Sequence, residues 1–423
     1  MKILHYALGF PPERSGGLVK YSLSLITEQI NSGHDVKLVY PGRFNITKKE
    51  PYFKSGIRQD IPCAELINAL PLPLIGNIKN PTDFMVPVNI NIFLDFLSTE
   101  KPDAIHLHTL MGLHSEFLTA AKQLNIKVVF TTHDFFGISP NPKFYLDGHD
   151  FVDDTEYDIW NNIQEYGSAT KKLRLVQLSI YPSLRNWLKK LKKSTVSNEN
   201  YVERLDWRSL QDTEFQDLKH YYLDMLQDID VVHFNSQVSK QVYRQFLPEM
   251  TWEEHVIPLT SDPITQNAEI QLTKNDIHTI AYVGPYSQEK GFFDFLKIAD
   301  EFLKLDSNNR AIVMGDDASI SFDNIVNFGK YDQKKMTQLL EDIDLVILPS
   351  QWHETFGLIA MEVLATGTKV IVSERMGVSE LLPDELKIKS KTFDLNWHKV
   401  AGFSTNIKFT STKEHYQTVT NLY

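Results

Sequence analysis

The stretch PSQWHETFGLIAMEVLATGTKVIV, residues 349–372, decides the fold class. An apolar run at 345–348 precedes it, and a second apolar run closes it. Between these runs, the periodicity predicts a polar loop that carries Glu354 and a helix that starts near Gly357, with Glu362 in its second turn. A strand, a helix and a further strand in this order are typical of a parallel βαβ unit, and therefore of an α/β protein.

The same alternation of short apolar strands and helices extends outward on both sides of this unit. The predicted strands lie at 2–6, 36–40, 104–107, 128–132 and 231–234 in the first half, and at 280–283, 311–314, 345–348 and 369–372 in the second. A single hydrophobic core stops growing at about 250 to 300 residues, so a chain of 423 residues is expected to form two. We therefore predict two domains with doubly wound parallel sheets.

The predicted N-terminal domain covers residues 1–258, and the predicted C-terminal domain covers 277–410. A polar, loop-like linker at 259–276 joins them. Residues 141–225 break the alternation and are rich in Tyr, Trp and charge, which predicts a mostly helical insertion in the N-terminal domain. Residues 411–423 are predicted to form a short closing helix.

Composition excludes several classes of protein. No apolar run reaches the roughly 18 residues that a membrane-spanning helix needs. The net charge of −11 argues against a general nucleic-acid binder. The single cysteine, Cys63, rules out internal disulfides and fits a reducing compartment. The first residues lack the order of a signal peptide, so we expect a cytoplasmic protein.

Gly16 and Gly17 follow the first predicted strand and precede a helical pattern. Glycines at such a junction let the backbone approach a ligand, and the start of the helix favours an anion. The spacing is not GxGxxG, so a dinucleotide site is unsupported. A plain strand-to-helix turn is the alternative interpretation.

Three histidines lie at the carboxyl ends of predicted strands, the edge where open α/β sheets bind ligands. His106 and His108 share one face of their strand, so both could be packing residues. A metal site is the weaker interpretation of this pair, and Asp134 could then contribute a ligand. His133 lies next to two phenylalanines and is the better functional candidate.

Lys290 and Gly291 end a glycine-bearing loop, residues 284–291, between a strand and a helical pattern. A lysine at such a junction suits a phosphate, because its ammonium neutralises charge while the helix amides donate hydrogen bonds. The Walker pattern is absent. A surface lysine in a turn is the alternative.

Glu354 and Glu362 are eight residues apart. With Glu354 in the loop and Glu362 in the helix, the free amides at the helix start could meet an anion, and Glu362 could accept hydrogen bonds from a diol. The paired carboxylates of glycoside hydrolases are a rival interpretation, but they must flank one bond, which this placement does not favour.

With these motifs the chain resembles the family 4 retaining glycosyltransferases, which have the GT-B fold. The resemblance rests on the E-x7-E pattern, the preceding Pro-Ser, the Phe-Gly-Leu and the A-x-G-x-x-V that follows. It extends to Gly16-Gly17, the His106-x-His108 strand, His133 and Lys290-Gly291. The stretch HDFFGISPNPKFY is similar to a subgroup that acts in bacterial surface polysaccharide assembly. The 141–225 insertion and the tail after about Pro383 fall outside the resemblance.

The resemblance implies two Rossmann-like domains that face a central cleft, with the acceptor on the N-terminal side and a nucleotide-diphosphate sugar on the C-terminal side. The closing helix would cross back to the N-terminal domain. Basic side chains and helix amides would carry the diphosphate, so neither a metal nor another cofactor is expected. The expected partners are the nucleotide sugar and a glycan or lipid-linked acceptor, and no nucleic acid.

The resemblance also implies roles for single residues. His133 would reach the transferred sugar from the opposite domain, and Glu354 would hold the donor sugar; these are the expected catalytic residues. Lys290 would contact the diphosphate, and Glu362 would hold the ribose hydroxyls. Gly17, next to Gly16, would approach the diphosphate or the acceptor.

The backbone amides near Phe356, Gly357 and Leu358 would complete the donor site. One position departs from the family pattern: an Arg often follows the glycine of the 284–291 loop, and here Pro285 stands there. Arg375 is the predicted substitute for the missing cation.

The expected function is metal-independent retaining transfer of a hexosyl group to a growing, lipid-linked capsular or exopolysaccharide glycan. Two alternatives remain. One is a catalytically weak or inactive GT-B subunit that supports a partner transferase, which Pro285 favours. The other is a nucleotide-sugar epimerase or hydrolase, which needs no acceptor.

A basic segment at 184–193 has apolar residues at helical spacing, including Trp187, and no acidic residue. A basic amphipathic helix with Trp suits an anionic membrane surface, which predicts peripheral binding at the inner face of the cell membrane. A core-packed helix with a solvated face is the alternative.

Charge reversal at four lysines tests this segment: Lys189, Lys190, Lys192 and Lys193. The variant should lose co-sedimentation with anionic vesicles, because each lysine near such a surface contributes about 1 kcal/mol. Neutral vesicles serve as the control. Unchanged binding to anionic vesicles would refute the membrane interpretation.

Overall fold

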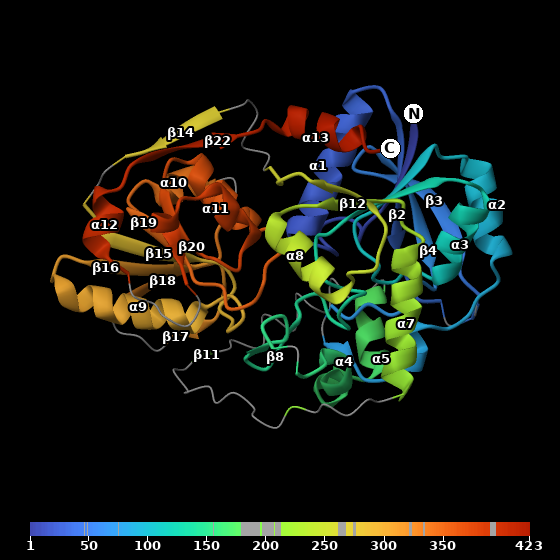
Figure 1. Cartoon of the computed structure of the whole chain (residues 1–423), viewed down its shortest axis with the longest axis horizontal. Helices are drawn as coiled ribbons and strands as arrows, with labels where there is room; N and C mark the ends of the chain where they lie inside the picture. Colours follow the sequence, from blue (N-terminus) through green and yellow to red (C-terminus); the bar gives the residue numbers. More distant parts are fainter. Residues whose placement is uncertain are drawn as a thin grey trace.

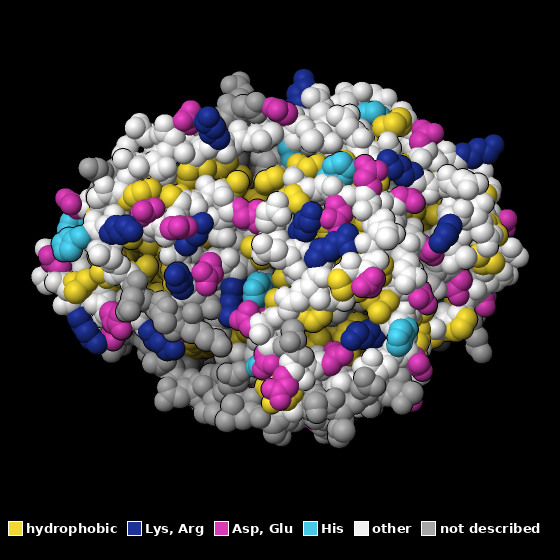
Figure 2. Space-filling model, in the orientation of Figure 1, with side chains coloured by type: hydrophobic (Ala, Val, Ile, Leu, Met, Phe, Trp, Pro, Cys, Tyr) yellow, Lys and Arg dark blue, Asp and Glu magenta, His cyan; other side chains and the backbone are white. Residues whose placement is uncertain are grey.

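The computed structural model describes the chain except residues 46, 49, 75, 155, 179–194, 197–206, 208–212, 261–267, 274–275, 321–323, 333–334 and 390–394. The predicted membrane helix at 184–193 lies outside the described residues. Among the described helices, none is long and apolar enough to cross a membrane. Figure 1 shows two α/β lobes side by side, and on the face in Figure 2 the acidic and basic side chains are interspersed.

The N-terminal lobe is built on an eight-stranded sheet, which is parallel except at its edge strand β3. In spatial order the strands are β13 (Glu253–Val256), β12 (Val231–Phe234), β7 (Lys127–Thr131), β6 (Ala104–Leu107), β1 (Lys2–Tyr6), β2 (Asp35–Pro41), β4 (Ile61–Ile67) and β3 (Tyr52–Arg58). Every residue of β6 and β12 is buried, as strands covered on both faces require. The order reverses between β1 and β6, which places a topological switch point at their carboxyl ends.

The C-terminal lobe has a six-stranded parallel sheet. In spatial order its strands are β18 (Ile325–Gly329), β16 (Arg310–Met314), β15 (Thr279–Val283), β19 (Leu345–Leu348), β20 (Lys369–Ser373) and β21 (Lys387–Ile388). Here the switch point lies between β15 and β19. The two doubly wound sheets confirm the predicted α/β class.

Helices connect the strands of both sheets. Those of the N-terminal lobe include α1 (Gly17–Asn31), α2 (Asn91–Glu100), α3 (Ser115–Gln123), α7 (Thr213–Gln227) and α8 (Gln237–Phe246). Those of the C-terminal lobe include α9 (Phe292–Leu305), α10 (Met336–Leu340), α11 (Leu358–Ala365) and α12 (Trp397–Gly402). In α9, six apolar residues and Asp294 are buried, and the apolar ones form the stripe that the sequence periodicity predicts.

The insertion at 141–225 contacts both lobes. Its described residues form the hairpin of β8 (Tyr145–Leu146) and β9 (His149–Asp150), the short helices α4 (Ile159–Asn162) and α5 (Thr170–Leu173), and most of α7. The Tyr145 hydroxyl donates to the Gln351 side chain at 2.8 Å, and His353 Nδ1 lies 2.8 Å from an oxygen of Asp150. The hairpin therefore joins the N-terminal lobe to the loop after β19.

The predicted linker at 259–276 is not wholly a loop. It contains β14 (Ala268–Leu272), which pairs antiparallel with β22 (Thr405–Phe409). The alternation of Ala268, Ile270 and Leu272 with polar residues is a period-two strand signal that the loop prediction overlooked. Its partner strand is distant in the sequence, which is why composition alone favoured a loop.

The end of the chain lies on the N-terminal lobe, where α13 (Thr412–Thr420) packs beside α1 (Figure 1). The Tyr21 hydroxyl lies 2.8 Å from His415 Nε2, and the Tyr423 hydroxyl lies 2.6 Å from His106 Nδ1. These contacts connect the C-terminal end of the chain to α1 and to β6 of the N-terminal sheet.

Candidate donor-binding cleft

A cleft of about 620 Å³ lies between the two lobes. Residues that follow both switch points line it, because the carboxyl edges of the two sheets face each other there. Of the residues singled out in the sequence, it brings together Gly16, Gly17, His133, Pro285, Lys290, Glu354, Phe356, Gly357 and Leu358.

Lys290 and Glu354 meet on the C-terminal wall. The Lys290 ammonium lies 2.9 Å from Glu354 Oε1, and the Ser350 hydroxyl donates to the same oxygen at 2.9 Å. The ammonium also lies 5.0 Å from the centre of the Trp352 ring. The Glu354 side chain is only 9% exposed, so its charge depends on these partners. An anion that enters the cleft would meet a cation held in one position.

A close backbone approach sets this geometry. Gly291 has φ 72°, and a Cβ there would lie 1.8 Å from the carbonyl oxygen of Pro349. The loop after β15 therefore passes directly against the loop after β19. Only glycine allows this contact, which places Lys290 beside Glu354.

The start of α11 faces the cleft. Gly357, with φ 102°, precedes the helix, and a Cβ there would lie 2.5 Å from Met376 Cε. Phe356 is buried and anchors the turn, and Leu358 opens the helix. The first amides of a helix lack intrahelical acceptors, so this turn presents donors to a ligand anion.

The two lobes touch at the cleft. A Cβ on Gly17 would lie 3.1 Å from Leu358 Cδ1. The Thr355 hydroxyl donates to the carbonyl of His133 at 2.9 Å, and the Ser236 hydroxyl donates to the carbonyl of Thr355 at 2.6 Å. These contacts hold His133 opposite the Glu354 loop.

Glu362 lies just behind the cleft wall and is 5% exposed. Its carboxylate pairs with Lys20 of α1, on the other lobe, at 2.7 Å. Tyr331 lines the cleft nearby, and burial, with the charge of Glu362, raises the pKa of its hydroxyl to about 12. No local sequence pattern indicates Lys20 as a partner, because the pair spans the two domains.

Arg375, the predicted substitute cation, is not among the residues that line the cleft. Its guanidinium pairs with Asp153 of the insertion and lies 3.6 Å from Asp150, and it donates to the carbonyl of Gln351. With its side chain 9% exposed, Arg375 holds the insertion against the C-terminal lobe.

A different cation, Lys330, lines the cleft, and it was not predicted from the sequence as a residue of the site. It follows β18 directly, at the carboxyl edge of the sheet, which is the signal that could have identified it. Its ammonium pairs with Asp317, and both side chains are well exposed, at 49% and 63%.

His133 lies in a strongly desolvated part of the cleft wall. Burial, with a smaller effect of His233, lowers its pKa to about 3, so the imidazole is neutral at physiological pH. Its Nε2 lies 3.1 Å from His108 Nδ1. Asp134, the predicted metal partner, instead accepts from the Phe136 amide at 3.0 Å, and burial raises the pKa of its carboxyl to about 7.

Comparison with known families agrees with this geometry. Residues 15–192 match the model of Glycosyltransferase Family 4, and residues 264–387 match that of Glycosyl transferases group 1. The two matches together span more than half of the chain. The chain belongs to the GT-B glycosyltransferases.

The curated relatives of this glycosyltransferase include proteins of a bacterial cps region and a lipopolysaccharide glycosyltransferase. A protein in the cps region of Klebsiella pneumoniae is 22% identical over 304 residues, 70% of this chain and 63% of that protein. The lipopolysaccharide 1,2-N-acetylglucosaminetransferase of Salmonella typhimurium is 30% identical over 128 residues, 26% of this chain and 33% of that enzyme. The chain thus spans less than two thirds of the length of these relatives.

Solved structures share the fold of the glycosyltransferase along its length. Anabaena HepE in complex with UDP has a TM-score of 0.54 at 14% identity, covering 100% of this chain and 95% of that one. Sucrose-phosphate synthase from Thermosynechococcus elongatus has a TM-score of 0.52 at 13% identity, covering 99% and 94%. At these identities the likeness concerns the fold alone.

Gly291→Ala should lower the free energy of unfolding by at least about 2 kcal/mol, because the left-handed backbone and the Pro349 carbonyl both oppose a Cβ. Urea unfolding measures this. Gly402→Ala, in α12 with nothing within 4 Å of its Cβ, is the matched control and should change stability by less than about 1 kcal/mol. Equal effects of the two substitutions would contradict the close approach.

Proposed function

We propose that this glycosyltransferase transfers a hexosyl group from a nucleotide-diphosphate sugar to a growing surface glycan, with retention at the anomeric carbon. The arrangement of Lys290, Glu354 and the start of α11 opposite His133 carries this proposal. It offers a cation and helix amides for a diphosphate, with a carboxylate and an imidazole at the position of the sugar.

The leaving diphosphate sets the main energetic demand, since its negative charge grows as the bond to the sugar breaks. Preorganised donors aimed at that charge lower the barrier. Lys290 and the first amides of α11 supply them without a metal ion. Lys330 supplies a second cation in place of the arginine that Pro285 replaces, since its exposed pair with Asp317 costs little to break.

The sugar and the nucleotide are held from both lobes. Glu354 accepts hydrogen bonds from the donor sugar, while Lys290 pairs with the Glu354 carboxylate. His133 contacts the transferred sugar from the N-terminal lobe. Glu362 accepts hydrogen bonds from the ribose, beside Tyr331. Closure of the cleft excludes water and so limits hydrolysis of the donor.

Retention follows from attack on the face that the leaving group vacates. The bond between the anomeric carbon and the phosphate oxygen breaks, and a bond to the acceptor oxygen forms on the same side. The acceptor hydroxyl gives its proton to an oxygen of the departing diphosphate. No side chain has to act as a nucleophile in this scheme, which suits a cleft wall where Glu354 is already paired with Lys290.

The acceptor is proposed to be a lipid-linked capsular or exopolysaccharide precursor. The cps-region relatives support this choice of pathway. Peripheral attachment to the inner face of the cell membrane, through residues 184–193, would bring the cleft to such a lipid. The N-terminal lobe would receive the acceptor.

Pro285 favours a second candidate, a catalytically weak subunit that supports a partner transferase. Its proline ring lines the cleft where the family often has a cation. The paired Lys290 and Glu354 count against this candidate, because a protein that only supports a partner has no need of them.

Nucleotide release should occur from one donor in a panel of UDP-, GDP-, dTDP- and ADP-sugars, and bacterial lipid extract should stimulate it. UDP-sugars are the first to test, since HepE is solved with UDP. Release that is equally fast without lipid would indicate a hydrolase or an epimerase. Neither turnover nor binding across the panel would support the partner-subunit candidate.

Glu362→Gln should raise the Kd for the matching nucleotide about tenfold or more, because charge-assisted hydrogen bonds to the ribose are weakened. Lys20→Gln is the matched control: it removes the charge of the partner but keeps the carboxylate, and the glutamine amide can still donate to it, so the Kd should stay within about threefold. Isothermal titration measures both values. An equal loss in the two variants would assign the effect to the ion pair between the lobes.

A further inference from the structure

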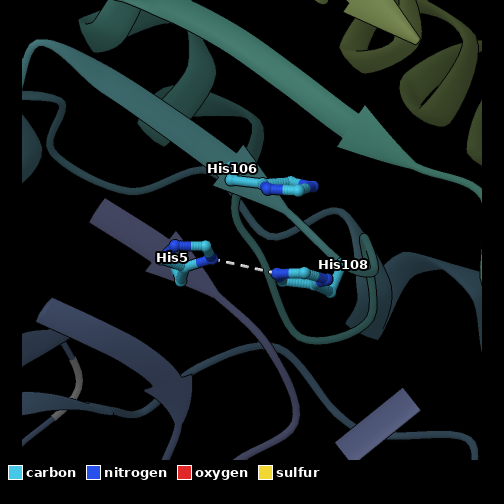
Figure 3. A group of neighbouring side chains, drawn as sticks. All are labelled: His5, His106 and His108. Carbon is cyan, nitrogen blue, oxygen red and sulfur yellow. Dashed lines mark hydrogen bonds between the residues drawn. The ribbon is translucent and has the colours of Figure 1, made fainter. Parts of the chain in front are cut away.

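Three histidines, His5, His106 and His108, form a buried cluster (Figure 3), and His108 contacts the cleft residue His133. Their nitrogens lie close enough together to hold a metal ion. All six ring nitrogens, however, already have hydrogen-bond partners: His5 with Gln29 and His108, His106 with Tyr423 and Thr131, and His108 with His5 and His133. The cluster is therefore part of a hydrogen-bonded network, and a metal would have to displace these partners.

One path through this network runs from the C-terminal helix to the cleft. Gln29 of α1 contacts Thr420 of α13 at 3.0 Å and His5 Nε2 at 2.7 Å. His5 Nδ1 lies 3.0 Å from His108 Nε2, and His108 Nδ1 lies 3.1 Å from His133 Nε2. Each group uses one atom toward α13 and another toward the cleft.

The direction of the first hydrogen bond is fixed by α13. The Thr420 hydroxyl donates its only proton to the carbonyl of Tyr416 at 2.7 Å, so its oxygen must accept from Gln29. The amide nitrogen of Gln29 therefore faces Thr420, and its oxygen faces His5. His5 Nε2 must then carry the proton that this oxygen accepts.

The remaining directions follow if the imidazoles are neutral, since a neutral ring has one donor and one acceptor. Burial lowers the pKa of His5 to about 4 and that of His108 well below its usual value. With its proton on Nε2, His5 accepts at Nδ1 from His108 Nε2. His108 in turn accepts at Nδ1 from His133 Nε2. His133 is left with an unprotonated Nδ1, for which no hydrogen bond to any described residue is found.

We propose that Gln29, His5 and His108 are positioning residues that fix His133 as the Nε2–H tautomer and present its Nδ1 to the cleft as a hydrogen-bond acceptor. This inference rests on the proposed function for the identity of the ligand group, which is a hydroxyl of the transferred sugar. A hydroxyl can donate to Nδ1, whereas a carboxylate at the same place cannot. Through this network, Thr420 of the C-terminal helix determines that His133 Nδ1 faces the cleft as an acceptor and not as a donor.

Nitrogen NMR of the ligand-free protein, labelled with ¹⁵N-histidine, tests the tautomer directly. Long-range proton–nitrogen correlations distinguish the two tautomers, and His133→Gln identifies the His133 signals. We expect a single Nε2–H tautomer in the wild-type protein. The Nδ1–H tautomer, or an equal mixture, would overturn the proposal. This measurement needs neither donor nor turnover, so it stands apart from any failure of the proposed function.

Gln29→Leu removes the acceptor that orients His5. The second tautomer of His133 should then appear, although residue 29 does not line the cleft. Thr420→Val should have a smaller effect in the same direction. Thr418→Val is the matched control, because its hydroxyl also bonds within α13 but is exposed. Circular dichroism checks that each variant is folded. An unchanged His133 tautomer in folded Gln29→Leu would refute the proposed hydrogen-bond path from Gln29 to His133.

Once the donor is known, Gln29→Leu should lower kcat about threefold to tenfold and leave the Kd of the free nucleotide unchanged. A purely structural defect would lower kcat and would also raise that Kd. A donor sugar that lacks the contacted hydroxyl should lose the difference between wild type and variant. If the difference in kcat between wild type and Gln29→Leu persists with every deoxy sugar tested, His133 Nδ1 does not contact a sugar hydroxyl.

Discussion

Parallel strands impose the constraint on which this molecule depends. Their carboxyl ends, and the starts of the helices that follow, all lie at one edge of the sheet. In each lobe the strand order reverses beside the first strand, at β1 and β6 and at β15 and β19, so no connection covers the edge at that point. Because two such edges face each other, loops that follow strands of both sheets meet in one cleft. The contact between Lys290 and Glu354, which come from opposite sides of a switch point, is a direct result.

The features that the sequence predicts well are those that depend on local pattern. Buried parallel strands are short apolar runs, and most of their positions were correct to within a residue. Lys290, Glu354 and Gly357 lie in loops next to such runs. The topology of their own sheet therefore brings them to its carboxyl edge, however the two domains are arranged. Partners across domains are different. Neither the pairing of Lys20 with Glu362 nor that of Arg375 with Asp153 has any local signal, since each depends on how distant surfaces pack.

The histidines show that a buried packing residue can also belong to a directed hydrogen-bond network. His106 and His108 do share one face and are fully buried, as the packing interpretation holds. Buried polar atoms nevertheless need partners, and in an imidazole each partner fixes where the proton lies. A packing residue can therefore carry directional information if its neighbours are also imidazoles. Burial keeps these rings neutral, and this neutrality makes the direction of each hydrogen bond definite.

The existing ion pairs of the cleft determine which lysine can bind an anionic ligand. Lys290 is already compensated by Glu354, and separating them would leave a carboxylate uncompensated at 9% exposure, which is costly. Under the proposed function, a diphosphate would therefore join this pair, and Lys290 would bridge the two anions. Lys330 and Asp317 are both exposed, and such pairs contribute at most about 1 kcal/mol, so Lys330 can turn to the ligand at little cost. With Pro285 in the place of a cation, the proposed donor site would rely more on the first amides of α11 for the diphosphate charge, and the backbone at Gly357 would then be as important to binding as any side chain.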